Sequence, residues 1–211
     1  MRLYNLDHSP YASRVRTQIR KKGLDIEFAP PPVELRTPAF NQRFPLGKVP
    51  VLELDDGSQL PDSWVIMEYL EVVNPAVPLC PEEAIPRAQM QLLARYADTY
   101  LSPGGLFPLF QRVGKPGDAE QELAGLDAEL ARLQRLLDFL PDFRQRSLHL
   151  GDIALAPAMD YVYLLGPLFG LEDPTAAYPR VSDWWQWVRE DEAVGATSEE
   201  MRAAVAKLFG G

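Results

Sequence analysis

The order of strand-forming and helix-forming patterns constrains the fold of this chain more than any other feature. Short runs with strand character lie at 2–6, 24–29, 49–54 and 59–60. No convincing strand pattern follows Leu60. From Met90 onward, apolar residues recur every three or four positions, as in amphipathic helices. The sequence therefore predicts a small α/β half followed by an all-helical half.

The first half contains clear helix and turn signals. Ser9 is a favoured N-cap residue, Pro10 suits the first helical position, and Gly23 is a stop, so a helix is expected over 10–22. The residues Asp-Asp-Gly-Ser at 55–58 predict a hairpin turn between two strands. A second helix is expected from Ser63. The predicted element order is βαβ, then a hairpin, then a helix.

A proline-rich segment separates the two halves. Residues 74–86 contain four prolines and show no periodicity. The predicted organisation is an N-terminal domain at 1–75, a linker at 76–86 and an all-helical C-terminal domain at 87–211. Helical patterns in that last domain lie at 90–97, 123–137, 153–168, 181–188 and 201–208.

Composition excludes several classes of function. The chain has 211 residues and a formal net charge of −9, which argues against binding to nucleic acid or to an anionic membrane. Cys80 is the single cysteine and His8 and His149 are the only histidines, so neither a disulfide framework nor a metal site is expected. The sequence shows neither a signal peptide nor a membrane span, and a cytoplasmic protein is expected.

The run Gly-Lys-Val-Pro-Val-Leu at 47–52 suggests a peptide-binding strand. A proline at the mouth of a strand cannot donate a ladder hydrogen bond. If the Val49–Pro50 bond is cis, the N–H and C=O of Val49 would face outward and could pair with an extended peptide. The alternative is an ordinary trans bond at a strand edge, which the local sequence alone favours because about one X-Pro bond in twenty is cis.

Two helix starts are candidate ligand sites. Asp62 and Ser63 open the second helix, where free N–H groups and the positive helix end favour a carboxylate and Asp62 can pair with an ammonium group. The hydroxyl of Ser9, at the start of the first helix, could donate to a thiolate. For each position the alternative is that the residue is a plain N-cap. The residue type taken alone favours this alternative in both cases.

Five stretches together resemble a known family. They are SPYASRVR (9–16), FPLGKVPVLELDDG (44–57), LPDSWVIMEYLE (60–71), LGDIALAPAMDY (150–161) and YPRVSDWWQWV (178–188). In this order, over nearly the whole chain, they resemble the cytosolic glutathione transferases. That resemblance implies a thioredoxin-like domain of βαβ-ββα order followed by a helical bundle. It also makes a cis Val49–Pro50 bond the expected form.

The resemblance implies a glutathione site with no metal. Ser9 would face the sulfur of glutathione, the co-substrate, as in serine-type members similar to the tau and omega classes. Lys48 would meet the glycine carboxylate, Val49 with Pro50 would pair with the cysteinyl backbone, and Asp62 with Ser63 would hold the γ-glutamyl group. Serine cannot form a mixed disulfide, which favours conjugation or peroxide reduction. Tyr11 and then Tyr4 are the rival catalytic groups.

The resemblance also implies partners. A small hydrophobic electrophile would bind near aromatic residues of the helical domain, and the candidates are Tyr11, Tyr96, Tyr100 and Phe107, although ordinary core packing suits the last three equally well. A homodimer with a role in detoxification is expected. One alternative is a non-catalytic regulator similar to the stringent starvation proteins, which binds a protein partner. Another is a glutathione-dependent dehalogenase or isomerase, which would share every residue named.

Two further features have structural interpretations. Five basic residues occupy the first predicted helix, and a solvated face is expected for Arg14, Arg16, Arg20, Lys21 and Lys22. The family usually has serine or threonine three residues before Asp152, where this chain has His149. Asp152 is expected to satisfy buried N–H groups and to stabilise the local fold.

Overall fold

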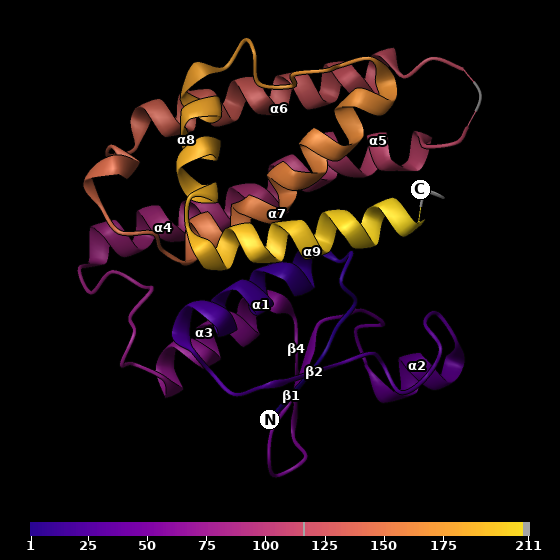
Figure 1. Cartoon of the computed structure of the whole chain (residues 1–211), viewed down its shortest axis with the longest axis vertical. Helices are drawn as coiled ribbons and strands as arrows, with labels where there is room; N and C mark the ends of the chain where they lie inside the picture. The colour runs from indigo at the N-terminus through magenta and orange to yellow at the C-terminus, as the bar shows by residue number, and fades with distance from the viewer. Residues whose placement is uncertain (116, 209–211) are drawn as a thin grey trace. The chain divides into compact units, whose positions relative to one another are not determined.

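The computed structural model describes residues 1–115 and 117–208. It divides into two compact units: Met1–Leu79 together with the described residues from Gly195 on, and Cys80–Val194. All the strands of the described residues lie in the first unit, and the second is helical, which confirms the predicted fold class (Figure 1). The domain and linker boundaries expected from the sequence stay a prediction.

A mixed four-stranded sheet forms the centre of the first unit. Its strands are β1 (Arg2–Tyr4), β2 (Glu27–Ala29), β3 (Val51–Glu53) and β4 (Gln59–Pro61), in the order β2-β1-β3-β4. β1 is parallel to β2 and antiparallel to β3, and β3 is antiparallel to β4. The register places Tyr4 opposite Val51 and Val51 opposite Pro61.

Helices lie on both sides of this sheet. α1 (Pro10–Lys22) and α3 (Ser63–Val73) lie on one side, and α2 (Pro38–Arg43) lies on the other (Figure 1). Tyr4 and Val51 form a buried cluster with Phe40 and Phe44, at one end of α2 and just after it. The sequence analysis did not predict α2, although Thr37 caps it by accepting from the N–H of Phe40.

The predicted solvated face on α1 is wrong. Arg14 and Arg16 are 2 % and 1 % exposed, and Lys22 is also buried. The ammonium group of Lys22 pairs with Glu71 at 2.9 Å and donates to the carbonyl oxygen of Asn74 at 2.8 Å. Lys22 and Arg16 are buried because segments outside α1 bring partners to them, which a helical wheel cannot reveal.

The second unit is built from helices and short 3-10 turns. They are α4 (Ala84–Tyr96), η1 (Ala97–Leu106), α5 (Phe107–Arg112), α6 (Glu120–Phe139), η2 (Phe143–Gln145), α7 (Leu150–Leu165), η3 (Gly166–Phe169) and α8 (Pro179–Arg189). η1 is a π-helix that follows α4 and continues directly into α5, with Pro103 inside it. The last helix, α9 (Glu192–Leu208), belongs to the first unit from Gly195 on.

Asp152 is the centre of a buried polar network at the start of α7. Its carboxylate accepts from Arg146 at 2.6 and 2.9 Å, from the N–H of His149 at 3.1 Å and from the indole of Trp184 at 2.9 Å. His149 Nδ1 completes a capping box by accepting from the N–H of Asp152. Burial would raise the pKa of Asp152, but the hydrogen bond from His149 and the hydrogen bonds and charge of Arg146 outweigh it and hold the pKa well below its ordinary value.

Asp152→Ala is expected to lower the free energy of unfolding by about 3 kcal/mol at pH 7, because it leaves several donors without an acceptor. A carboxylate with a lowered pKa stabilises the fold above its unfolded pKa of about 4, so the difference from wild type should shrink as the pH falls below that value. Thermal and urea unfolding between pH 3 and 7 measure this. Asp183→Ala removes a half-exposed partner of Arg144 and serves as a control that should change little. Equal stability of the Asp152→Ala protein and the wild type would contradict the assignment.

Candidate functional site

Ser9 is the N-cap of α1. Its backbone is extended, with φ −76° and ψ 120°, and Pro10 fills the first helical turn. The hydroxyl oxygen accepts from the N–H of Ala12 at 3.3 Å, so Ser9 does cap the helix. A hydroxyl has one donor hydrogen besides its acceptor lone pairs. Ser9 is half-buried and can therefore still donate to an anion held at the positive end of the helix.

Val49 lies two residues before β3, where the chain enters the sheet. The Val49–Pro50 peptide is cis, as expected from the resemblance. Among the described residues, no hydrogen bond is made by the N–H or the C=O of Val49. Both groups are therefore available to an extended peptide, which would pair with them as a short added strand.

Lys48 and Gly47 complete the same loop. Gly47 has φ 62°, in the left-handed region that favours glycine, and an added β-carbon would displace the exposed side chain of Asn41. Lys48 is exposed and has no ion-pair partner in the part of the chain that the structure describes. Its ammonium group is therefore available to a carboxylate.

Asp62 is the N-cap of α3 and has an unusual backbone conformation. Its Oδ1 accepts from the N–H groups of Trp64 and Val65 at 2.9 and 3.2 Å, which again realises the cap alternative. Its φ of 75° with ψ 124° is a sparsely populated positive-φ conformation, which costs a non-glycine residue of the order of 1–3 kcal/mol. Asp62 is exposed, and its second carboxylate oxygen has no partner among the described residues, whereas Ser63 is buried.

The sheet register brings these three segments to one end of the sheet. The segment with Ser9 follows Tyr4 at the end of β1, Val49 precedes Val51 at the start of β3, and Asp62 follows Pro61 at the end of β4. Tyr4, Val51 and Pro61 are directly paired across the three strands, and paired residues lie about 5 Å apart. The β3–β4 turn and the N-terminus lie at the other end, where the terminal amine pairs with Asp55 at 2.6 Å (Figure 1).

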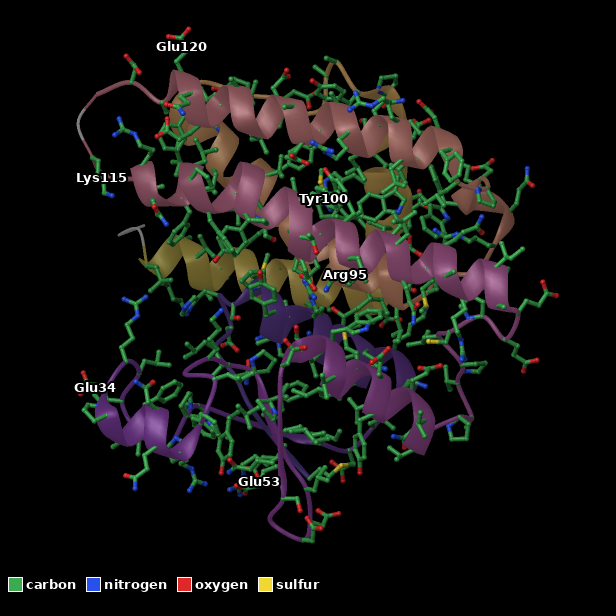
Figure 2. All side chains as sticks on the ribbon, turned by 180° about the vertical axis from the view of Figure 1, so that it is seen from behind. Glu34, Glu53, Arg95, Tyr100, Lys115 and Glu120 are labelled. Carbon is green, nitrogen blue, oxygen red and sulfur yellow. The ribbon has the colours of Figure 1, made fainter. Side chains whose placement is uncertain are left out.

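The two tyrosines considered as rivals have their own partners. Tyr4 is 4 % exposed, and its hydroxyl contacts both oxygens of Glu53, a residue labelled in Figure 2, at 3.3 and 3.2 Å. This confirms Tyr4 as a packed strand residue. Tyr11 is half-buried, and the guanidinium carbon of Arg14 lies 4.9 Å from the centre of its ring.

The aromatic candidates of the second unit differ in exposure. Tyr96 is buried, and its hydroxyl donates to the carbonyl oxygen of Glu129 at 2.7 Å; burial, followed by the charge of Glu129, raises the pKa of Tyr96. Its environment is that of a core residue. Tyr100, labelled in Figure 2, and Phe107 are both exposed. The ring of Tyr100 stacks on Tyr96 with centroids 6.0 Å apart.

Within 1–115 and 117–208, no group of three or more histidine, cysteine, aspartate or glutamate side chains is arranged to hold a metal ion. In the same ranges, no helix is both long enough and apolar enough to cross a membrane.

Comparison with known proteins gives consistent matches. Residues 3–77 match the model of the glutathione S-transferase N-terminal domain. The glutathione S-transferase-like protein LUC7 of a Fusarium species is 30 % identical over 92 % of this chain and 90 % of its own length.

Solved structures match over similar lengths. A glutathione S-transferase from Methylobacillus flagellatus KT with glutathione bound is 26 % identical, covers 93 % of this chain and 98 % of its own, and has a TM-score of 0.76. A maleylacetoacetate isomerase from Methylobacterium extorquens AM1 with malonate and glutathione bound is 27 % identical, covers 96 % and 97 %, and has a TM-score of 0.73.

Two substitutions at Asp62 separate the contribution of its N-cap to stability from the cost of its backbone conformation. Asp62→Ala is expected to lower the free energy of unfolding by about 2 kcal/mol, because it removes the cap and leaves alanine at positive φ. Asp62→Asn should change it by only a few tenths of a kcal/mol, since asparagine caps equally well and tolerates that conformation. Urea unfolding of both variants measures the difference, and equal losses for alanine and asparagine would contradict this account.

Proposed function

This chain belongs to the glutathione S-transferase family, and on that premise we propose that it is a glutathione transferase with its glutathione site at one end of the first unit's sheet. The observation that carries the proposal is the register of β1, β3 and β4, which brings Ser9, Val49 and Asp62 to the same end. Each of the three retains a polar group that its own cap or loop does not use.

The assignment of residues follows the chemistry of the tripeptide. The main chain of Val49 pairs with the cysteinyl unit, which fixes the register of the ligand as one strand fixes another. The carboxylate of Asp62 takes the γ-glutamyl ammonium group, while the hydroxyl and the N–H of Ser63, at the positive end of α3, take the neighbouring carboxylate. Lys48 takes the glycine carboxylate. Pro50 is buried and holds the loop rather than touching the ligand.

The chemical role of the site is to stabilise a thiolate. A free thiol has a pKa of about 8.5, and a hydrogen bond to its ionised form, worth roughly 1.5–3 kcal/mol, lowers that by one to two pH units. In the proposed reaction the Ser9 hydroxyl donates to the sulfur anion, and the thiol proton passes to water. The sulfur then forms a bond to an electrophilic carbon, and the leaving group departs with its electron pair.

The same thiolate serves two further reactions. With a hydroperoxide, two glutathione molecules are oxidised to the disulfide and the peroxide is reduced to an alcohol and water. The similarity to a maleylacetoacetate isomerase makes glutathione-dependent isomerisation a second candidate. Analysis of the products separates these reactions, because they share the glutathione site.

The electrophile is proposed to be small and hydrophobic. Tyr100 and Phe107 are the preferred contacts in the second unit, since both rings are exposed, and Tyr96 would act by supporting the ring of Tyr100. Tyr11 is the candidate from the first unit. The family resemblance extends the proposal to a cytoplasmic homodimer that acts in detoxification. A monomer mass in light scattering at micromolar concentration would contradict the dimer.

Ser9→Ala tests the catalytic assignment. With excess wild-type protein, the thiolate absorbance of glutathione should titrate with a pKa at least one pH unit below that of the free thiol, and Ser9→Ala should abolish the difference. Thr37→Ala is the matched control, because it removes the N-cap hydroxyl of α2 in the same unit. Both variants should lose about 1 kcal/mol of stability, but only Ser9→Ala should change the thiol.

Two results would count against this function. Glutathione that binds without any shift in thiol pKa would remove the catalytic role of Ser9 and favour a non-catalytic regulator. An absence of binding would remove the glutathione site as well.

A further inference from the structure

Arg16 is a buried arginine that holds the turn leading to Ser9. It is 1 % exposed. Its Nη1 donates to Oδ1 of Asn5 at 2.6 Å and lies 3.2 Å from Oδ1 of Asp7, and its Nη2 donates to the carbonyl oxygen of Asp7 at 3.0 Å. One guanidinium group therefore bonds both the main chain and the side chains of residues 5–7.

That turn is joined directly to Ser9. The N–H of Ser9 donates to the carbonyl oxygen of Leu6 at 2.9 Å, and Leu6 O also lies 3.4 Å from Arg16 Nη1. Arg16 further donates to the hydroxyl of Ser13, one helical turn after Ser9, at 3.1 Å. The guanidinium thus ties the turn before Ser9 to the first turns of α1, and Ser9 lies between the two anchored points.

The C-terminal helix brings a counter-charge close to Arg16, whose Nε makes no hydrogen bond within the described residues. Glu200 of α9 lies 3.7 Å from Nε of Arg16 and 2.6 Å from Nη2 of Arg20. Arg20 also donates to the hydroxyl of Thr197 at 2.6 Å, so it holds α9 in place. Arg20 has no bond to residues 5–7 in the described part of the chain.

Both the charge and the shape of the guanidinium group make arginine the residue that suits position 16. Burial lowers the pKa of Arg16, Asp7 and Glu200 oppose that effect, Arg20 adds to it, and the group stays charged at neutral pH. His8, inside the turn, interacts with both Asp7 and Arg16, and burial lowers its pKa. A lysine at position 16 would keep the charge, but its single ammonium group could not span Asn5, Asp7 and Ser13 at once.

We propose that Arg16 is a positioning residue for Ser9: its guanidinium fixes the turn of residues 5–7, and the nearby charge of Glu200 of the C-terminal helix supports the guanidinium in that orientation. This inference rests on the proposed function, because it concerns the hydroxyl assigned to the thiolate. It adds a connection from the end of the chain to that hydroxyl.

A double-mutant cycle tests whether Arg16 acts through Ser9. Wild type, Arg16→Lys, Ser9→Ala and the double variant are titrated for the pKa of bound glutathione and for the Kd of S-methylglutathione, which has no thiol proton. Arg16→Lys should raise the thiol pKa by about half a pH unit or more and change the Kd of S-methylglutathione less than about threefold. In a protein that already carries Ser9→Ala, Arg16→Lys should cause almost no further rise in the thiol pKa.

Two further variants complete the test. Glu200 is half-exposed, so Glu200→Gln is not expected to disturb folding. It should raise the thiol pKa by a smaller amount than Arg16→Lys does. Arg2→Gln removes an exposed ion pair with Glu27 in the same unit without touching Arg16 or Glu200, and this control should leave the thiol pKa at the wild-type value.

The outcomes distinguish the two proposals. An unchanged thiol pKa in both Arg16→Lys and Glu200→Gln, or equal shifts with and without the Ser9 hydroxyl, would overturn the role of Arg16 while the proposed function stands. If Arg16→Lys fails to fold, a raised thiol pKa in Glu200→Gln is sufficient to support the connection. A wild-type protein that does not lower the thiol pKa would overturn the proposed function and this inference together.

Discussion

The pairing of three short strands is the constraint on which the site depends. Tyr4, Val51 and Pro61 lie side by side in β1, β3 and β4, and the three candidate segments leave the sheet next to them. A slip of one residue would turn every side chain of a strand to the opposite face. It would remove Tyr4 and Val51 from the cluster with Phe40 and Phe44, so packing and site geometry are fixed by the same register.

Helix capping and the proposed ligand binding can use the same side chains without conflict. Ser9 caps α1 through its oxygen and keeps its hydrogen, and Asp62 caps α3 through one carboxylate oxygen and keeps the other. The sequence presents these roles as alternatives, but the cap only fixes the side chain in place. A fixed donor or acceptor needs less reorganisation when the ligand arrives, which is the usual basis of preorganised stabilisation.

Local sequence signals were sufficient for the order of the four strands and of α1 and α3 in the first unit, but not for α2. Ser9 with Pro10, Gly23 and the turn at 55–58 each specify backbone geometry within a few residues. The buried charges were not predictable in this way. Lys22 is buried against Glu71, which lies far away in sequence, and Arg16 is buried against residues 5–7, which only the folded turn brings to it. The membership of α9 in the first unit is a tertiary property of the same kind.

A crystal structure of the protein with glutathione tests the central claim most directly. The account predicts that the cysteinyl backbone pairs with Val49, that the γ-glutamyl group lies at Asp62 and Ser63, and that the sulfur lies within hydrogen-bonding distance of the Ser9 hydroxyl. Glutathione bound elsewhere, or bound here with its sulfur directed to Tyr11 instead of Ser9, would contradict it.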